Sequence, residues 1–400
     1  MYSRPGYGLY YHTMSHDVSR PISDAATVVL AGDIGGTNTT LALVQTANGR
    51  YTILGSERYA SKELSSISEA IARARRTFGA EQWQRVDRCC LCAAGPTDGN
   101  RSRMSNLSWE IDGDRVQQEL NVPTRVINDF SGICYGIPVL YRQSPEQFVA
   151  IPHSDGSLPA PDGSVIAVVG AGTGLGLGFL TRLPDGTVTA HPSEGGHSDF
   201  APFDEETLAL WSFVASRYDA PTGAECFLSG QGIINIFDYA VETGGSPNRT
   251  VHQILQLEPH DRPARIAANA NRDQTCHRTI DIFVRIYARF SASAALHFFA
   301  TGGLFLAGGI AARNRELFLQ HNRFMSTFEM NYKASIRPLL KRVPVSIVAD
   351  YSVSLYGAAY AAVHLADSDR PRASRPRDGA DRHGDARRAE HAKGREEASS

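Results

Sequence analysis

Two stretches of this chain share one pattern: an apolar run, a short loop rich in glycine and threonine, and a second apolar run. The first stretch spans residues 28–44 and the second spans residues 164–180. Runs of this length around glycine-rich loops predict two strands joined by a tight turn. Because glycine lacks a Cβ atom, the backbone N–H groups of such a loop can approach an anion closely. Each stretch therefore predicts a β-hairpin whose loop is either an ordinary turn or a phosphate-binding loop.

The second loop can also be compared with the glycine motif of dinucleotide-binding proteins. Its sequence is GAGTG at residues 170–174. The dinucleotide motif requires a helix directly after the glycines. Here the glycines lead into an apolar run at 177–180, a Pro-Asp-Gly turn and another apolar run at 188–190, which indicates a hairpin. Two hairpins of this kind are expected of a duplicated ATPase architecture, in which the two loops grip one nucleotide from both sides.

The remaining pattern predicts further strands and helices along the chain. Strands are expected at residues 51–59, 89–94, 104–111, 125–127, 304–310 and 343–349. Helices are expected at residues 64–78, 204–218, 233–241, 279–299 and 354–365, from residues 128–130 onward, and up to Leu120 from an N-cap at Asp112 or Asp114. This mixture predicts an α/β fold.

Composition along the chain suggests where domains begin and end. Residues 139–163 are rich in Pro, Ser and Gly and predict a domain boundary. We expect a small α/β domain at 27–138 plus 349–366, and a large α/β domain at 139–348. Residues 1–26 lack apolar periodicity and are expected to form a flexible arm. Residues 367–400 carry mixed charge without apolar periodicity and are expected to be a disordered tail.

Overall charge and cysteine content narrow the function classes. The chain has 400 residues, with 40 Lys and Arg against 42 Asp and Glu, and a net charge of −2. This balance gives no reason to expect nucleic acid or a membrane surface as a partner. No apolar run approaches the roughly 18–20 residues that span a bilayer, and no signal core is visible, so a cytoplasmic location is expected. The six cysteines lack paired metal-ligand spacing, and buried reduced thiols are expected.

Asp129 is the first candidate for chemistry. It follows the expected strand at 125–127 and precedes an expected helix. Ligands of open α/β sheets bind at the carboxyl ends of strands, which is where this carboxylate would lie. The structural alternative is that Asp129 is a helix N-cap, a position at which Asp is common.

Three other segments carry candidate ligand-binding groups. Glu194 and His197 flank two glycines, which disfavour a regular helix and predict a compact polar loop offering both groups to one ligand. Glu225 lies just before the sequence LSGQG. Gly308 and Gly309 end an expected buried strand, where they either let a phosphate or flat ring approach the backbone or form a simple strand–helix turn.

Together these segments resemble the bacterial-type glucokinases of the hexokinase/actin-like ATPase fold. The resemblance covers residues 28–365. The matching blocks are GDIGGTN at 32–38, MSNLSW at 104–109, INDF at 127–130, GAGTGLG at 170–176, EGGHSDFAP at 194–202, AECFLSGQG at 224–232 and AGGI at 307–310. Each block alone is modest, and their common order and spacing carry the resemblance.

The resemblance implies a fold, an activity and a set of site residues. The fold would be a two-domain actin-like ATPase (ribonuclease H-like) fold, with duplicated β-hairpin phosphate loops and an interdomain cleft. The activity would be transfer of the ATP γ-phosphoryl group to the 6-hydroxyl of D-glucose, with Asp129 as general base. Sugar hydroxyls would be held by Asn128, Asp129, Glu194, His197 and Glu225. The ATP phosphates would lie near Gly32, Asp33, Ile34, Gly35, Gly36, Thr37, Gly172 and Thr173. Gly308 and Gly309 would lie beside the adenosine, and Asp33 would hold Mg²⁺ directly or through water.

Some positions depart from the family pattern, and some alternatives stay open. Cys226 stands where the family often has Arg, which leaves the orientation of Glu225 open, and Gln231 stands where it often has Pro. The cysteine-rich zinc signature of the related repressor and kinase (ROK) family and a helix-turn-helix segment are absent from the sequence, and so is the P-loop signature GxxxxGK[ST]. A kinase for another hexose or amino sugar, a non-catalytic sugar sensor, ADP or polyphosphate as donor, and a homodimer remain as alternatives.

Overall fold

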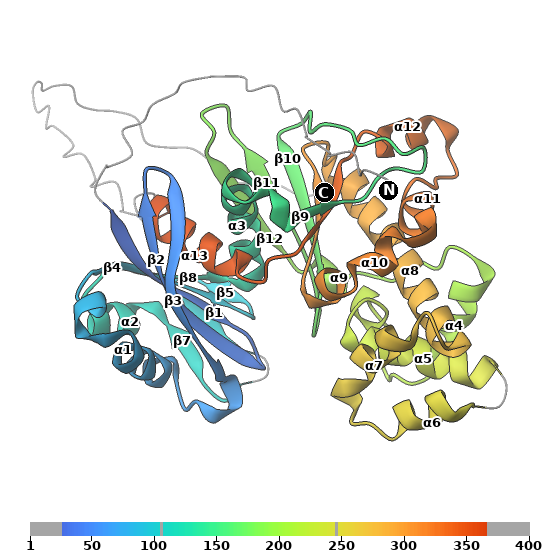
Figure 1. Ribbon diagram of the computed structural model, residues 1–400, viewed down its shortest axis with the longest axis horizontal. Coiled ribbons are helices and arrows are strands. Elements are labelled where there is room, and N and C mark those ends of the chain that lie inside the picture. The colour runs from blue at the N-terminus through green and yellow to red at the C-terminus, as the bar shows by residue number, and fades with distance from the viewer. Residues whose placement is uncertain (1–25, 105–106, 245–246, 366–400) are drawn as a thin grey trace, which may run out of the picture.

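Two β-sheets organise the computed structural model, which describes residues 26–104, 107–244 and 247–365 (Figure 1). Apart from residue 26, the predicted arm and tail lie outside the described residues. The first sheet has the order β3-β2-β1-β4-β8. Its strands are β1 (Thr27–Ile34), β2 (Asn38–Ala47), β3 (Arg50–Ala60), β4 (Val86–Ala93) and β8 (Thr124–Asn128). β1, β2 and β3 pair antiparallel, whereas β4 and β8 continue the sheet in parallel with β1.

The second sheet repeats this arrangement and adds one strand. Its order is β12-β11-β10-β13-β14-β9. The strands are β10 (Val165–Ala171), β11 (Leu175–Arg182), β12 (Val188–Ser193), β13 (Leu304–Ala307), β14 (Val345–Val348) and β9 (Phe148–Ala150). β10, β11 and β12 pair antiparallel, β13 and β14 follow in parallel, and β9 is antiparallel to β14. The duplicated hairpins predicted from the sequence are therefore present.

Burial explains why the central strands read as continuous apolar runs. Both β1 and β10 lie in the interior of their sheets, and most of their residues are buried. The edge strand β3 instead alternates between more and less exposed residues, as expected for a strand with one face toward solvent. A third, small sheet joins β5 (Thr97–Asp98), β6 (Arg101–Arg103) and β7 (Glu110–Asp112).

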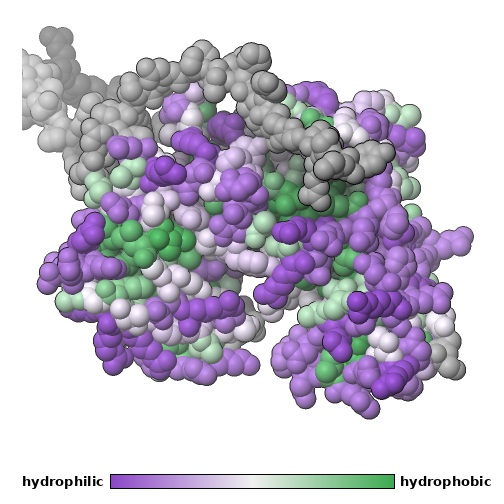
Figure 2. Space-filling model, in the orientation of Figure 1, coloured by the Kyte–Doolittle hydropathy of each residue, from purple (hydrophilic) through white to green (hydrophobic). Residues whose placement is uncertain are grey.

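Helices cover both sheets. They are α1 (Ile67–Trp83), α2 (Gly113–Leu120), α3 (Asp129–Gln143), α4 (Glu205–Ala215), α5 (Gly230–Thr243), α6 (Arg249–Leu255), α7 (Arg262–Asn269), α8 (Gln274–Phe298), α9 (Gly309–Arg313), α10 (Arg315–Leu319), α11 (Arg323–Phe328), α12 (Arg337–Leu340) and α13 (Val353–His364). In the view of Figure 1, α1, α2 and the first sheet form one lobe, and α4 to α7 lie in the other. Figure 2 shows the surface hollowed between the lower parts of these lobes.

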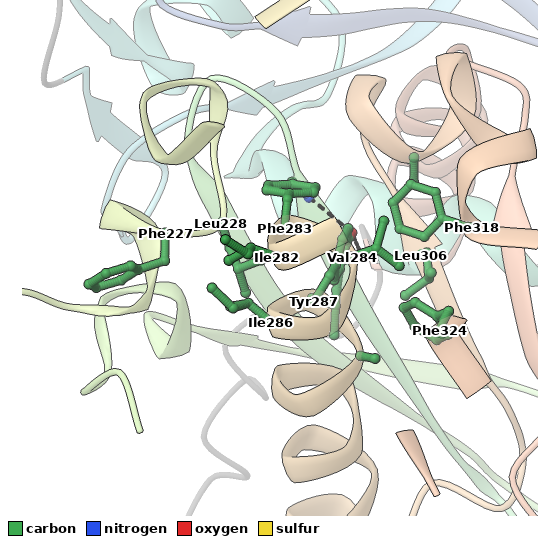
Figure 3. Packing of buried hydrophobic residues seen from close by; sticks show 14 of the residues in the cluster. Phe227, Leu228, Ile282, Phe283, Val284, Ile286, Tyr287, Leu306, Phe318 and Phe324 are labelled. Carbon is green, nitrogen blue, oxygen red and sulfur yellow. Dashed lines mark hydrogen bonds between the residues drawn. The ribbon is translucent and has the colours of Figure 1, made fainter. Parts of the chain in front are cut away.

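The long helix α8 is the centre of the largest core and fixes the end of β10. Figure 3 shows Tyr287 on the side of α8 that faces Phe318 and Phe324, whereas Ile282 and Ile286 lie on the side of Phe227 and Leu228. The buried Tyr287 hydroxyl donates to the Val169 carbonyl (3.1 Å) and accepts from the Ala171 N–H (3.2 Å). Because these are the last residues of β10, this hydroxyl anchors the strand just before its glycine loop.

α3 and α13 lie between the two sheets and share one core with both (Figure 1). They cross at glycines that allow very close backbone contact. A Cβ atom on Gly357 would lie 1.7 Å from the Gly132 carbonyl oxygen, and one on Gly136 would lie 1.8 Å from the Val353 carbonyl oxygen. Larger side chains would force the two helices apart.

Several element predictions need correction. Of the predicted strand at 104–111, only the end is confirmed, as β7; residues 107–109 lie outside any strand, and residues 105–106 are not among the described residues. The segment 139–163 is not a plain connection, since α3 continues to Gln143 and β9 joins the second sheet. The predicted domain boundary therefore falls within α3, and the division into domains stays a prediction.

Candidate active site

Asp129 is the first residue of α3, directly after β8. The N-cap is its neighbour Asn128, whose Oδ1 accepts from the N–H groups of Phe130 (3.0 Å) and Ser131 (3.2 Å). The Phe130 N–H also donates to Asp129 Oδ1 (2.8 Å). The capping alternative for Asp129 is therefore wrong, because the neighbouring Asn128 has that role. The Asn128 Nδ2 group donates to the Gly95 carbonyl at 3.4 Å.

Asp33 is the second carboxylate of the site, near the end of β1. The Ser354 hydroxyl, at the start of α13, donates to Asp33 Oδ2 at 2.7 Å. Burial raises the pKa of Asp33, and the Ser354 hydrogen bond and the Arg58 charge offset part of that rise. Ser354 was not predicted as a site residue, since it is 321 positions from Asp33 along the chain.

The electrostatics of Asp129 differ from those of an ordinary surface aspartate. Burial raises the pKa of Asp129 to about 6, the negative charge of Asp33 adds to the rise, and the Phe130 N–H opposes it. The charge of Glu194 raises this pKa further. Asp33, Asp129 and Glu194 therefore lie close enough for their charges to interact. A carboxylate with such a pKa is ionised at neutral pH and still accepts protons better than a free aspartate does.

The first glycine loop, at residues 35–37, is held in place by hydrogen bonds from Ser61. The Gly35 N–H donates to the Asn38 carbonyl (2.8 Å), and the Ser61 hydroxyl donates to the Gly35 carbonyl (2.7 Å). The Ser61 N–H donates to the Thr37 carbonyl (2.9 Å), while the Thr37 residue itself is exposed. The loop is thus fixed by its carbonyl groups.

Two residues predicted around the ATP phosphates, Gly32 and Ile34, lie within β1. A Cβ on Gly32 would lie 2.6 Å from Leu91 Cδ2, and the Ile34 side chain is fully buried. Packing explains both residue types, and any phosphate contact from them would come from the backbone.

The second glycine loop contains Gly172, Thr173 and Gly174 and is held by its neighbours. The Gly172 N–H donates to the Gly174 carbonyl, and the Gly230 N–H donates to the Gly172 carbonyl, both at 2.8 Å. Glu225 Oε2 accepts from the Leu175 N–H at 2.8 Å. Glu225, a predicted sugar ligand, is therefore bonded directly to the end of this loop.

The turn that carries Glu225 is fixed without the Arg that the family often has next to it. The buried Asn235 donates from Nδ2 to the Cys226 carbonyl (2.9 Å), and the Ser229 hydroxyl donates to the Glu225 carbonyl (2.8 Å). Together with the Leu175 N–H, these bonds orient the Glu225 carboxylate. Sequence analysis did not single out Asn235, because nothing local marks it as a partner of this turn.

Glu194 and His197 form the predicted compact polar loop. Residues Gly195–His197 make one 3-10 turn, and His197 Nε2 lies 3.8 Å from Glu194 Oε2. Both side chains are exposed, His197 by 63% and Glu194 by 72%, and both can contact a ligand. A Cβ on Gly196 would lie 1.8 Å from the Leu175 carbonyl oxygen, so this turn packs directly on the end of the second loop.

Gly308 joins β13 to α9 in a backbone conformation that favours glycine. Its φ is +86°, and a Cβ there would lie 2.5 Å from the Ala171 carbonyl oxygen. The Tyr351 hydroxyl donates to the Gly309 carbonyl at 3.3 Å. A surface pocket beyond this turn is lined by residues of α7, α9 and α10 and their connections: Ala267, Asn271, Ala312, Arg313, Asn314, Arg315, Glu316, Leu317 and Gln320.

Metal-ligand groups are sparse. Among the described residues, no cluster of three or more His, Cys, Asp or Glu side chains is suited to hold a metal ion. Mg²⁺ commonly uses one or two carboxylates together with waters and substrate phosphates, and Asp33 fits that kind of shared site. Within the same part of the chain, no helix is long and apolar enough to cross a membrane.

Comparison with known proteins gives consistent matches. The family model described as Glucokinase matches residues 30–365. A glucokinase of Nostoc punctiforme is 34% identical over 359 residues, covering 85% of this chain and 100% of the relative. The crystal structure of a glucokinase from an Antarctic psychrotroph has a TM-score of 0.68 at 26% identity. The match covers 84% of this chain and 98% of the chain in that crystal structure.

A more distant match supports the fold. A ROK family glucokinase from Streptomyces griseus, solved in complex with glucose and AMPPNP, has a TM-score of 0.55 at 20% identity, with 84% of this chain and 99% of that chain covered. The predicted α/β, actin-like ATPase fold is confirmed by these structural matches and by the duplicated sheets.

Proposed function

This chain belongs to the glucokinase family, and from that membership we propose that it transfers the γ-phosphoryl group of ATP to the 6-hydroxyl of D-glucose. Membership makes the chain a hexose kinase that uses ATP. The choice of glucose, the acceptor hydroxyl and the residue roles are the proposal. The observation that carries it is Asp129, a carboxylate at the start of α3 whose pKa burial and the Asp33 charge raise to about 6.

Asp129 acts as the general base. The 6-hydroxyl of glucose is a weak nucleophile at neutral pH, and it loses its proton to the Asp129 carboxylate as its oxygen bonds to the γ-phosphorus. The bond between that phosphorus and the bridging oxygen breaks, and ADP leaves with the bonding electrons. Proton removal by a positioned base contributes about 10²–10⁴-fold to such a step. The remainder depends on in-line positioning and on neutralising charge on the phosphate oxygens.

The two glycine loops supply that neutralisation. Backbone N–H groups near Gly36 and Thr37 in the first loop, and near Thr173 in the second, bind the phosphates from two sides, while the Gly172 N–H is engaged by the Gly174 carbonyl. Hydrogen bonds to the carbonyl groups of Gly35 and Gly172 hold the loops in place, which favours such binding. Asp33 would hold Mg²⁺ together with water and the phosphates, and the ion would neutralise part of the phosphate charge.

The side chains that bind the hydroxyl groups of glucose are those of Asn128, Glu194, His197 and Glu225. Because Glu225 Oε2 is engaged by the Leu175 N–H, Oε1 is the oxygen left for a sugar hydroxyl. Glu194 and His197 expose their polar ends on the neighbouring turn. A site that bonds hydroxyl groups rejects analogues that lack them, since its own polar groups are then left without partners.

A single steady-state assay on the purified full chain tests this function. Formation of the sugar phosphate is followed with glucose, mannose and N-acetylglucosamine as acceptors, and ATP, ADP and polyphosphate are compared as donors. The expected result is the highest kcat/KM for glucose with ATP. A higher kcat/KM for mannose or N-acetylglucosamine would move the activity to another hexose or amino sugar, and sugar binding without turnover would make the protein a sensor.

A further inference from the structure

Phe130 places its ring against the strands of the second glycine hairpin. The residue is only 9% exposed. A Cβ on Gly176 would lie 2.2 Å from Phe130 Cδ2, and one on Gly170 would lie 2.6 Å from Phe130 Cε2. A Cβ on Gly178 would lie 3.0 Å from Phe130 Cδ1. The ring therefore occupies the volume that side chains at these three positions would fill.

Backbone conformation does not explain these glycines. None of Gly170, Gly176 and Gly178 has a positive φ, whereas Gly308 does. The three residues lie within β10 and β11, outside the loop at 172–174, so they are not themselves the phosphate loop. What they share is contact with one aromatic ring. These three glycines thus form a packing site for the Phe130 ring, called the seat below.

The same residue also contacts the catalytic carboxylate. The Phe130 N–H donates to Asp129 Oδ1 at 2.8 Å, and the side chain leaves the helix toward β10 and β11. Asp129 follows β8 of the first sheet, whereas the seat lies in the second sheet, directly before and after the loop that contains Gly172. Phe130 thus connects the end of the first sheet to the second phosphate loop through one side chain.

We propose that Phe130 is a positioning residue that sets the distance between the Asp129 carboxylate and the second phosphate loop. This inference rests on the proposed kinase function. A shift of about 1 Å in such a distance is enough to slow a reaction roughly 10²-fold, because the reacting atoms leave the productive geometry. Sugar binding depends on other side chains, so displacing the Phe130 ring from the three glycines lowers kcat more than it raises the KM for glucose.

Two complementary substitutions test the seat. Gly170→Ala places a methyl group against Cε2 and Cζ of the ring, which are atoms that Leu lacks. Phe130→Leu removes those atoms. Each single variant is expected to lower kcat at least tenfold with a glucose KM within about threefold of wild type. In the double variant the methyl group occupies the vacated volume, and kcat is expected to recover at least threefold over Gly170→Ala alone.

Two further variants keep the test decisive. Gly178→Ala makes a milder contact, at 3.0 Å from both the ring and Cys134 Sγ, and is expected to fold with a smaller loss of kcat than Gly170→Ala. Phe328→Leu is the matched control, since Phe328 is fully buried in the large core on α11 and its ring packs against His153 and Phe324. It is expected to lower the melting temperature with kcat unchanged.

The outcomes separate the two proposals. Wild-type kcat in Gly170→Ala and Gly178→Ala overturns the positioning role, as does a double variant whose losses add. Equal losses of kcat in Phe328→Leu and Phe130→Leu overturn it too, since the effect would then be general destabilisation. A wild-type protein that phosphorylates no sugar overturns the proposed function and the inference together. An active wild type whose Gly170→Ala and Phe130→Leu variants keep the wild-type kcat overturns the inference alone.

Discussion

Replacing Asp129 by Asn is expected to reduce activity and to increase stability. Asn has the same shape, and its Oδ1 can still accept the Phe130 N–H bond that Asp129 accepts at 2.8 Å. It cannot take a proton from the sugar hydroxyl, so kcat should fall about 10²-fold or more. The stability gain arises because the fold disfavours the ionised carboxylate.

The pKa of Asp129 gives the size and the sign of that gain. Burial and the Asp33 charge raise it from 3.8 to about 6. At about 1.4 kcal/mol per pKa unit, ionised Asp129 costs the fold about 3 kcal/mol at most, and partial exposure reduces this to about 1–3 kcal/mol. The cost is fully present above the folded pKa of about 6 and fades as the pH falls toward the unfolded value of 3.8. Asn has no such cost at any pH.

Urea unfolding of wild type and Asp129→Asn at pH 7.5 and pH 5 measures this difference. The variant should be more stable than wild type at the higher pH by about 1–3 kcal/mol, and the gap should narrow at the lower pH. Steady-state assays on the same samples give kcat. A variant that is destabilised equally at both pH values would refute the electrostatic reasoning, and a variant with near wild-type kcat would show that Asp129 is not the base.

Three further predictions follow from individual residues. The kcat/KM for glucose should fall on the acid side with an apparent pKa near that of Asp129, about 6, and should be about tenfold lower one pH unit below it, whereas a profile flat to pH 4.5 would contradict this assignment. His197→Ala should raise the KM for glucose about tenfold or more with little change in the KM for ATP, and coupling to Glu194→Gln is expected with 1- and 2-deoxyglucose, since strictly additive losses would argue against a sugar contact. Tyr287→Phe should cost about 1–3 kcal/mol in urea unfolding because the Val169 carbonyl and Ala171 N–H lose their buried partner, and an unchanged midpoint would show that water replaces it.

Local patterns in the sequence were sufficient for the elements that surround the site. The two hairpins were predicted from apolar runs around glycine loops, and the helix after Asp129 from the end of the preceding strand. The position of Glu194 beside His197 also followed from local spacing, since two glycines favour a tight turn. These features depend on residues close together in the chain.

Long-range contacts account for what the sequence did not reveal. Gly170 and Gly176 were part of the glycine-rich block at residues 170–176, whereas the structure places them against the Phe130 ring. Ser354 reaches Asp33 across 321 positions, which no local pattern indicates. Of the strand predicted at residues 104–111, only the last residues pair with a neighbour, as β7 beside β6 in the small sheet. Tertiary packing decides such positions.

The most direct test of the proposed reaction is to identify its product. Wild-type protein is incubated with ATP, Mg²⁺ and glucose, and the mixture is followed by ³¹P NMR. The proposed reaction predicts one new phosphomonoester signal, coupled to the C6 protons of glucose and growing in step with ADP. ADP and free inorganic phosphate without a sugar ester, or a phosphate on another hydroxyl of glucose, would contradict it.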